Sequence, residues 1–282
     1  TGQHLIRQPD INQASFDALE ANIALPSAQR ANTNALRPYR GYTNIMMRLS
    51  DANSQYNALQ TFISKRRGAI MWTQSYTMGF ANDNASSNTD NPEGYLDKNY
   101  NWGPSSNDRR NILVETWTWS VPFLKNDTGV LGSTLGGWQI SGIVHYQSGS
   151  PLTITGSTAI GTRRADYLGG DAYIPASGRT NANGAIVWLN PAVFTAAPET
   201  RLGNGKRGQF TGPNYQDVDL TFRKVFALPR HGTKLTIQAD LFNALNHTNF
   251  SNPATTVTSA NFGQITSVGP PRNIQLGMRI DF

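Results

Sequence analysis

The last ten residues of the chain, Asn273-Ile274-Gln275-Leu276-Gly277-Met278-Arg279-Ile280-Asp281-Phe282, alternate between two kinds of side chain. The even positions are apolar, and they are Ile274, Leu276, Met278, Ile280 and Phe282. The odd positions are polar or small. Because successive side chains of a β-strand point to opposite faces, this stretch predicts a strand with one apolar face that ends on an aromatic residue.

The same alternation recurs upstream. Six further stretches carry it, at 55–66, 69–80, 109–121, 137–149, 216–227 and 233–245. The stretch 109–121 is the least regular, because Trp117 and Trp119 share their face with Glu115. These segments exceed the ~5–6 residues usual in soluble sheets and suit the ~9–11 residues of a tilted membrane strand. All 15 prolines fall outside them, as expected for residues that cannot donate to a strand ladder.

The composition agrees with an all-β chain. The 282 residues include 26 glycines, 38% apolar residues and 15% charged residues, with a net charge of +6. No apolar run approaches the ~18 residues of a membrane-spanning helix, which excludes a helical membrane protein but not a membrane β-barrel. The absence of cysteine excludes disulfides and cysteine catalysis.

The predicted connections alternate in length. Those at 67–68, 122–136 and 228–232 are short or moderate, whereas those at 81–108, 150–215 and 246–271 are long and rich in Asn, Gly, Ser and Pro. Short turns at one end and long loops at the other are typical of outer-membrane barrels. We therefore expect two regions. Residues 1–54 form an extracellular loop region with a short helix around Asp10 to Leu25 and a short strand within 42–49, and residues 55–282 form barrel strands and loops.

The predicted fold is all-β, an antiparallel up-and-down transmembrane β-barrel segment with long extracellular loops. Seven strands is an odd number, whereas single-chain bacterial barrels use even numbers. The chain also opens at Thr1 without a Met or a signal peptide. The odd strand number predicts the C-terminal part of a larger barrel, and the start at Thr1 indicates a processed product or a fragment.

Several long phrases resemble a known family. The stretches 242–250 (Phe-Asn-Ala-Leu-Asn-His-Thr-Asn-Phe), 261–267 and 269–276 are similar to the C-terminus of Oar-like TonB-dependent outer-membrane receptors of the Acidobacteria type, which carry a carboxypeptidase-regulatory-like domain. Earlier phrases that resemble the family lie at 37–42, 55–60, 108–111, 136–142 and 188–194. The resemblance covers essentially the whole chain.

The resemblance implies ligand uptake across the bacterial outer membrane through a 22-stranded, plugged barrel. The chain then represents roughly the last third of that barrel, and the N-terminal strands, the plug and the TonB box lie outside it. Implied partners are lipid and lipopolysaccharide, the missing N-terminal barrel and plug, the TonB complex and a small ligand of unknown identity. The family's terminal aromatic, which the barrel-assembly machinery reads, maps onto Phe282.

Motifs for chemistry are weak. The run 203–208 matches G-x-G-x-x-G but lacks the flanking strand and helix of a dinucleotide site, which predicts a flexible basic loop. The four histidines show no metal-ligand spacing. Asp217 and Asp219 share a face with Arg223, which is ordinary for a wet barrel lumen. We expect no enzyme, no metal, no cofactor and, because basic pairs sit apart from the aromatics, no nucleic-acid partner.

The aromatic residues fall into two groups. Those on or near strands are expected at the membrane interface, namely Trp72, Trp117, Trp119, Trp138 and Tyr146. Two tryptophans lie in long loops, where they either pack the loop or stack on a ligand. The candidate ligand contacts in the loops are Trp102, Arg163, Arg164, Tyr167 and Trp188. Loop 150–215 is the longest and the leading candidate.

Two other classes of protein stay open from the sequence. A separately existing β-rich fragment with open strand edges could self-assemble into a surface or filament structure. A soluble all-β sugar-binding module is a third reading. Heat-modifiable migration on gels and detergent dependence distinguish the membrane protein from the soluble module.

Overall fold

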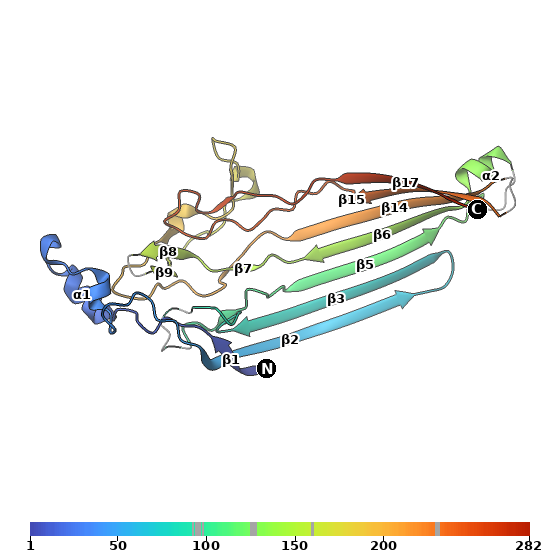
Figure 1. Ribbon diagram of the computed structural model, residues 1–282. Coiled ribbons are helices and arrows are strands. Elements are labelled where there is room, and N and C mark those ends of the chain that lie inside the picture. Colours follow the sequence, from blue (N-terminus) through green and yellow to red (C-terminus); the bar gives the residue numbers. More distant parts are fainter. Residues whose placement is uncertain (92, 94–96, 98, 125–128, 159–160, 229–231) are drawn as a thin grey trace.

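The computed structural model describes residues 1–91, 93, 97, 99–124, 129–158, 161–228 and 232–282. Its main body is one antiparallel sheet in the order β1-β2-β3-β5-β6-β14-β15-β17, in which each long strand pairs with the next one along the chain (Figure 1). The strands are Gly2–Arg7 (β1), Leu49–Lys65 (β2), Ile70–Asp83 (β3), Asn111–Ser120 (β5), Trp138–Gln147 (β6), Tyr215–Ala227 (β14), Lys234–Phe242 (β15) and Asn273–Asp281 (β17). The all-β, up-and-down prediction is confirmed.

The remaining elements are short. Helices α1 and α2 span Phe16–Ile23 and Val130–Leu135. The 3-10 helices are Ser27–Gln29, Thr33–Leu36, Ala176–Gly178 and Pro191–Val193. The loop strands are Gly103–Pro104 (β4), Pro151–Leu152 (β7), Thr155–Thr158 (β8), Gly161–Arg164 (β9), Asp166–Tyr167 (β10), Ile186–Val187 (β11), Phe194–Thr195 (β12), Phe210–Thr211 (β13) and Gln264–Ile265 (β16). Among the described residues, none of the helices is long and apolar enough to cross a membrane.

The strand register places the apolar side chains of neighbouring strands on one face. One row of directly opposed residues runs from β17 to β3 through Leu276, Ala239, Phe222, Ile140, Trp119 and Ile70. The adjacent row on the other face runs through Gln275, Asp240, Thr221, Ser141 and Thr118. In that row Thr221 Oγ1 donates to Asp240 Oδ1 at 2.7 Å. The sheet therefore has one apolar and one polar face.

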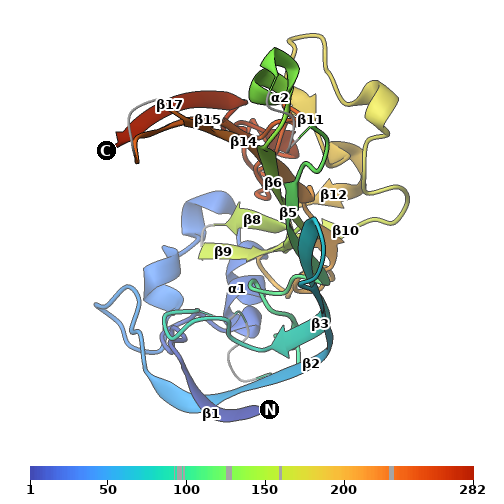
Figure 2. The same cartoon turned by 90° about the vertical axis from the view of Figure 1, so that its right-hand side faces the viewer.

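The sheet bends into an arc, with α1, β8 and β9 on its concave side and α2 on its convex side (Figure 2). Helix α2 is attached to the apolar face, because Lys224 on that face donates hydrogen bonds to the carbonyls of Thr134 and Gly136. The apolar face is therefore convex and the polar face concave, as in the wall of a membrane barrel.

The first 54 residues differ from expectation at three points. Residues 2–7 form β1, which no alternation predicted, and β2 begins at Leu49 rather than at 55. The prediction of a separate short strand within 42–49 is wrong, since Met46 makes an isolated bridge to Asp10 and Leu49 is the first residue of β2. The polar start of β2 is held in the sheet by a bidentate pair from Arg7 to Asp51, at 2.6 and 2.9 Å. Cross-strand pairing, rather than periodicity, forms this part of the strand.

When β1 is included, eight strands follow one another across the sheet. The inference from an odd number of strands is therefore wrong. Within the described residues, β1 pairs only with β2 and β17 only with β15, and the arc stays open. The helix expected between Asp10 and Leu25 is confirmed as α1, which begins after Ser15, whose Oγ accepts from the backbone N–H of Ala18.

A pair of neighbouring substitutions on β17 tests the assignment of the two faces. We expect Leu276→Arg to destabilise the folded protein in lipid by about 2–4 kcal/mol, because it places a cation on the apolar face at mid-strand. Gln275→Arg, on the polar face, is the matched control and should cost far less. Urea unfolding in liposomes measures both, and an equal loss in the two variants would contradict the assignment.

Candidate functional site

The long loops pack into a structured layer beyond the strand ends at the end of the sheet opposite α2 (Figure 1). Short strand pairs join distant segments there, β7 with β13, β10 with β12 and β11 with β16. The buried apolar residues of these loops form one cluster, which consists of Leu152, Ile154, Ala165, Ala172, Leu189, Phe194, Phe210 and Phe262. Phe194 lies at its centre, with ring centroids 5.1 Å from Phe210 and 5.6 Å from Phe262.

Tyr167 and Trp188 pack against this cluster. The Tyr167 ring lies 5.3 Å from that of Phe210, and Trp188 Nε1 donates to the carbonyl of Thr211 at 3.2 Å. The guanidinium of Arg179 covers the Trp188 ring at 3.9 Å. The rings of Tyr167 and Trp188 therefore stabilise the packing of the loops.

A polar cavity of about 450 Å³ opens beside the cluster, between the N-terminal segment and two of the long loops. Its lining comprises Asp10, Asn44, Asn84, Asp90, Asn91, Glu93, Asn101, Thr153, Thr155, Gly161, Thr162, Arg164 and Arg207. Amide and hydroxyl side chains dominate, and the five charged groups are of both signs. Small-ligand sites are concave and fix their ligand through polar groups, and this cavity is unusually rich in such groups.

Arg164 forms one wall of the cavity through two partners. Its guanidinium stacks on the Tyr100 ring at 3.3 Å and lies 3.7 Å from Glu93 Oε2, to which the Tyr100 hydroxyl donates at 3.0 Å. Burial raises the pKa of both Glu93 and Tyr100, and for Tyr100 the neighbouring carboxylate raises it further. The charged side chains of this wall are therefore already engaged with each other.

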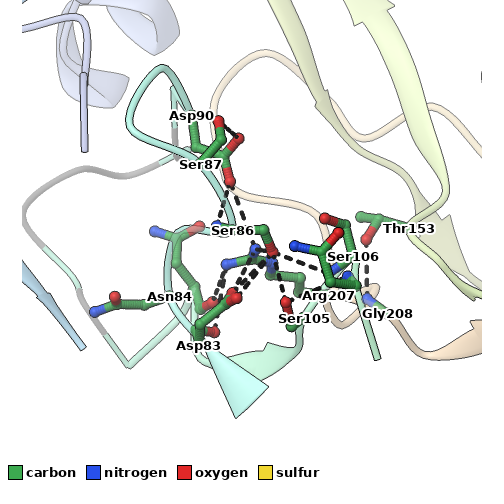
Figure 3. Close-up of polar contacts among 12 residues, drawn as sticks. Asp83, Asn84, Ser86, Ser87, Asp90, Ser105, Ser106, Thr153, Arg207 and Gly208 are labelled. Carbon is green, nitrogen blue, oxygen red and sulfur yellow. Dashed lines mark hydrogen bonds and ion pairs between the residues drawn. The ribbon is translucent and has the colours of Figure 1, made fainter. Parts of the chain in front are cut away.

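Arg207 also lines the cavity and joins two loops (Figure 3). Its Nη2 lies 2.6 Å from Asp83 Oδ1 and 3.6 Å from Asp90 Oδ2, and donates to Ser86 Oγ at 2.7 Å. Its Nη1 donates to the carbonyls of Asp83 and Asn101. With a side chain only 15% exposed, Arg207 is a largely buried cation that holds residues 83–101 against the loop that carries it.

The G-x-G-x-x-G run is a packed connection, which corrects the expectation of a flexible basic loop. A Cβ on Gly203 would lie 2.1 Å from the carbonyl oxygen of Arg164, and one on Gly205 would lie 2.6 Å from that of Ala165. Gly208 has a φ of +59°, a conformation that glycine adopts without strain. The glycines allow the backbone to approach β9 closely, and β13 follows them instead of the helix of a nucleotide site.

The structure separates the five loop candidates of the sequence. Only Arg164 lines the cavity, while Tyr167 and Trp188 pack the loop. Arg163 is 5% exposed and covers the Phe16 ring of α1 at 4.8 Å, and burial lowers its pKa. Trp102 is 41% exposed outside the lining. The carboxylates and amides of the lining could not be predicted from the sequence, because irregular loops carry no periodicity and only the basic pairs at 163–164 and 206–207 stood out.

The strand aromatics lie together on the apolar face. Trp72 is directly opposite Trp117, and its Nε1 donates to the carboxylate of Glu115 on the same face. Trp119 and Trp138 complete a band near the short-turn ends of the strands, and Tyr146 lies near the opposite end of β6. The role of this band at a membrane interface stays a prediction.

The residues expected to signal barrel assembly alternate along β17. Ile274, Leu276, Met278 and Ile280 lie exposed on its apolar face, and Phe282 follows the strand fully exposed. Their recognition by an assembly machinery stays a prediction.

Arg207 provides a sharp test of how the loops are held. We expect Arg207→Met to release the 83–101 loop, because removing one partner of a buried ion pair costs on the order of 3 kcal/mol. Limited trypsin and chymotrypsin digestion of the membrane-embedded protein should then cleave this loop faster. The exposed neighbour Lys206→Met is the matched control, and equal cleavage of both variants would refute the role of Arg207.

The pair between Asp166 and Arg201 makes the loops sensitive to acid. Hydrogen bonds from Arg201 (2.6 and 3.0 Å) and from the Asn204 backbone lower the pKa of Asp166. A carboxyl group whose pKa is lower in the folded protein stabilises the fold at pH values above its unfolded pKa of about 3.9. This stabilisation is lost as the pH falls through the folded-state pKa. The destabilisation by Asp166→Asn should therefore be large at pH 5 and shrink towards pH 2. Pepsin digestion measures it, with exposed Asp171→Asn as the control, and a constant difference across this range would contradict it.

Comparison with known proteins identifies the fold at family level. A family model described as an outer membrane beta barrel domain matches residues 1–275, which include every strand of the curved sheet before β17 and the first three residues of β17. Comparison with curated proteins and with solved structures gives no match. The family agrees with the apolar convex face, the polar concave face and the alternation of short turns with long loops. The chain therefore belongs to the outer membrane beta barrel domain family and is a barrel protein of the bacterial outer membrane.

Proposed function

We propose that this chain forms wall and outer loops of a TonB-dependent receptor that takes up a small ligand across the outer membrane. The observation that carries the proposal is the polar cavity of about 450 Å³ among the long loops. In outer-membrane barrels the short turns face the periplasm and the long loops face outwards, so the cavity belongs to the extracellular side of the barrel. The resemblance of several phrases to Oar-like receptors supports the same function.

The cavity suits a polar ligand. Its arginines and most of its carboxylates are engaged in pairs, whereas the side chains of Asn44 and Thr162 make no hydrogen bond among the described residues. These two side chains can form hydrogen bonds with a ligand in place of the water molecules that the ligand loses on binding. No covalent chemistry is needed for uptake, because the receptor binds the ligand and then releases it into the lumen.

A second candidate function rests on the open edges of the sheet. The strands β1 and β17 each have one neighbour within the described part of the chain. A free edge presents unpaired N–H and C=O groups to another chain. These edges favour either further barrel strands or self-assembly into a structural layer, and energy-dependent uptake separates the two.

Uptake by cells that express the full receptor tests the proposal. The probes are a radiolabelled ferric chelate, a corrinoid, an oligosaccharide and a peptide, each with and without a protonophore. We expect one class to enter only in energised cells. Failure of all four to show energy-dependent uptake would contradict the receptor function.

The cavity itself is tested by filling it. The double variant Asn44→Trp and Thr162→Trp should weaken binding of the transported probe at least tenfold, about 1.4 kcal/mol, because the indoles occupy the ligand volume. Asn183→Trp, on an exposed turn outside the lining, is the control. Heat-modifiable migration verifies that each barrel is folded. Unchanged binding by the double variant would place the ligand elsewhere.

A further inference from the structure

The connection between β5 and β6 carries apolar side chains that the described part of the protein leaves uncovered. Val130 is 79% exposed, Leu131 63% and Leu135 57%, all on helix α2, and Phe123 before the helix is 66% exposed. A turn that only reverses the chain needs none of these residues. Four exposed apolar side chains on one connection indicate a surface that is covered by lipid or by another molecule.

The three exposed apolar residues of α2 lie on one side of the helix, together with exposed Thr134. At about 100° per residue, Val130, Leu131 and Leu135 span an arc of about 140°. Gly132 is buried on the other side, and exposed Ser133 lies outside the apolar arc. The helix therefore has one side against the protein and one apolar side that faces outwards.

Lys224 holds α2 on the barrel wall. Its side chain projects from the apolar face of β14, is 3% exposed, and donates from Nζ to the carbonyls of Thr134 and Gly136, both at 2.7 Å. Trp138 Nε1 donates to the same Thr134 carbonyl at 3.2 Å. Cations favour the carbonyl end of a helix, and the rings of Trp138 and Phe226 flank the ammonium at 5.6 and 4.9 Å. The orientation of α2 is thus set by the wall.

This position is continuous with the membrane-facing surface. Helix α2 lies at the short-turn end of the sheet (Figure 1) and on its convex side (Figure 2), and Trp138 of the tryptophan band donates to its Thr134 carbonyl. Tryptophan belts mark the boundary between lipid and water. A helix fixed at that level with an apolar outer side buries that side in the boundary between headgroups and acyl chains.

We propose that helix α2 forms a membrane-surface anchor, in which Val130, Leu131 and Leu135 insert into the phospholipid interface on the short-turn side. Lys224 is the positioning residue, because it satisfies the last carbonyls of α2 and aims the apolar side at the lipid. The anchor requires only the outer-membrane barrel and is independent of ligand uptake.

Nitroxide labels measure the depth of α2 directly, since the chain contains no cysteine of its own. Leu131→Cys and Ser133→Cys are introduced separately in the full barrel protein in phosphatidylethanolamine and phosphatidylglycerol liposomes. We expect collisions with oxygen to exceed those with a water-soluble nickel chelate at 131 and the reverse at 133. Equal accessibility of both positions to the nickel chelate would overturn the anchor.

The positioning role of Lys224 is tested in the same labelled protein. Lys224→Met keeps the length of the side chain but removes its hydrogen bonds, and should raise nickel accessibility at 131 severalfold. Arg223→Met, the exposed neighbour on the polar face, should leave it unchanged. Heat-modifiable migration confirms that both barrels are folded. Unchanged lipid depth in Lys224→Met would overturn the positioning role.

Discussion

The hydrogen-bonded register of the curved sheet is the constraint on which the rest of the structure depends. In lipid each backbone N–H and C=O needs a partner within the protein, so only a continuous ladder can form the wall. A shift of one residue in any strand would turn its apolar side chains to the other face. Rows such as the one from Leu276 through Phe222 to Ile70 show that the register is coherent across the sheet.

Two charged residues on the apolar face show how the wall tolerates exceptions. Glu115 interrupts the alternation of β5, and it accepts a hydrogen bond from the indole of Trp72 on the next strand. Lys224 is covered by α2 and Trp138. Glu115 lies in the middle of β5 and Lys224 near the short-turn end of β14, and each has a tryptophan beside it that supplies an apolar ring. The irregular stretch 109–121 is therefore a strand whose exception is satisfied across the sheet.

The loop layer depends on a different kind of stabilisation. Its apolar cluster is small, and buried arginines tie the cluster to its surroundings, with Arg207 bound to Asp83 and Arg164 to Tyr100 and Glu93. Because the partners come from loops far apart in the chain, the cavity between them exists only in the folded layer. Sequence reasoning could pick out basic pairs and loop tryptophans there, but not which of them face the cavity.

Alternation by itself determined the seven long strands and their apolar faces, because a period of two is a local property of the chain. Strand length and the alternation of short and long connections added the outer-membrane barrel class. Composition and loop length likewise indicated where long connections lie. Only the tertiary structure decided that β1 pairs with β2, that Gly203 and Gly205 allow a close backbone approach, and that α2 stands on the convex face. Those features arise from contacts between segments distant in sequence, and such contacts leave no periodic pattern in the residues that make them.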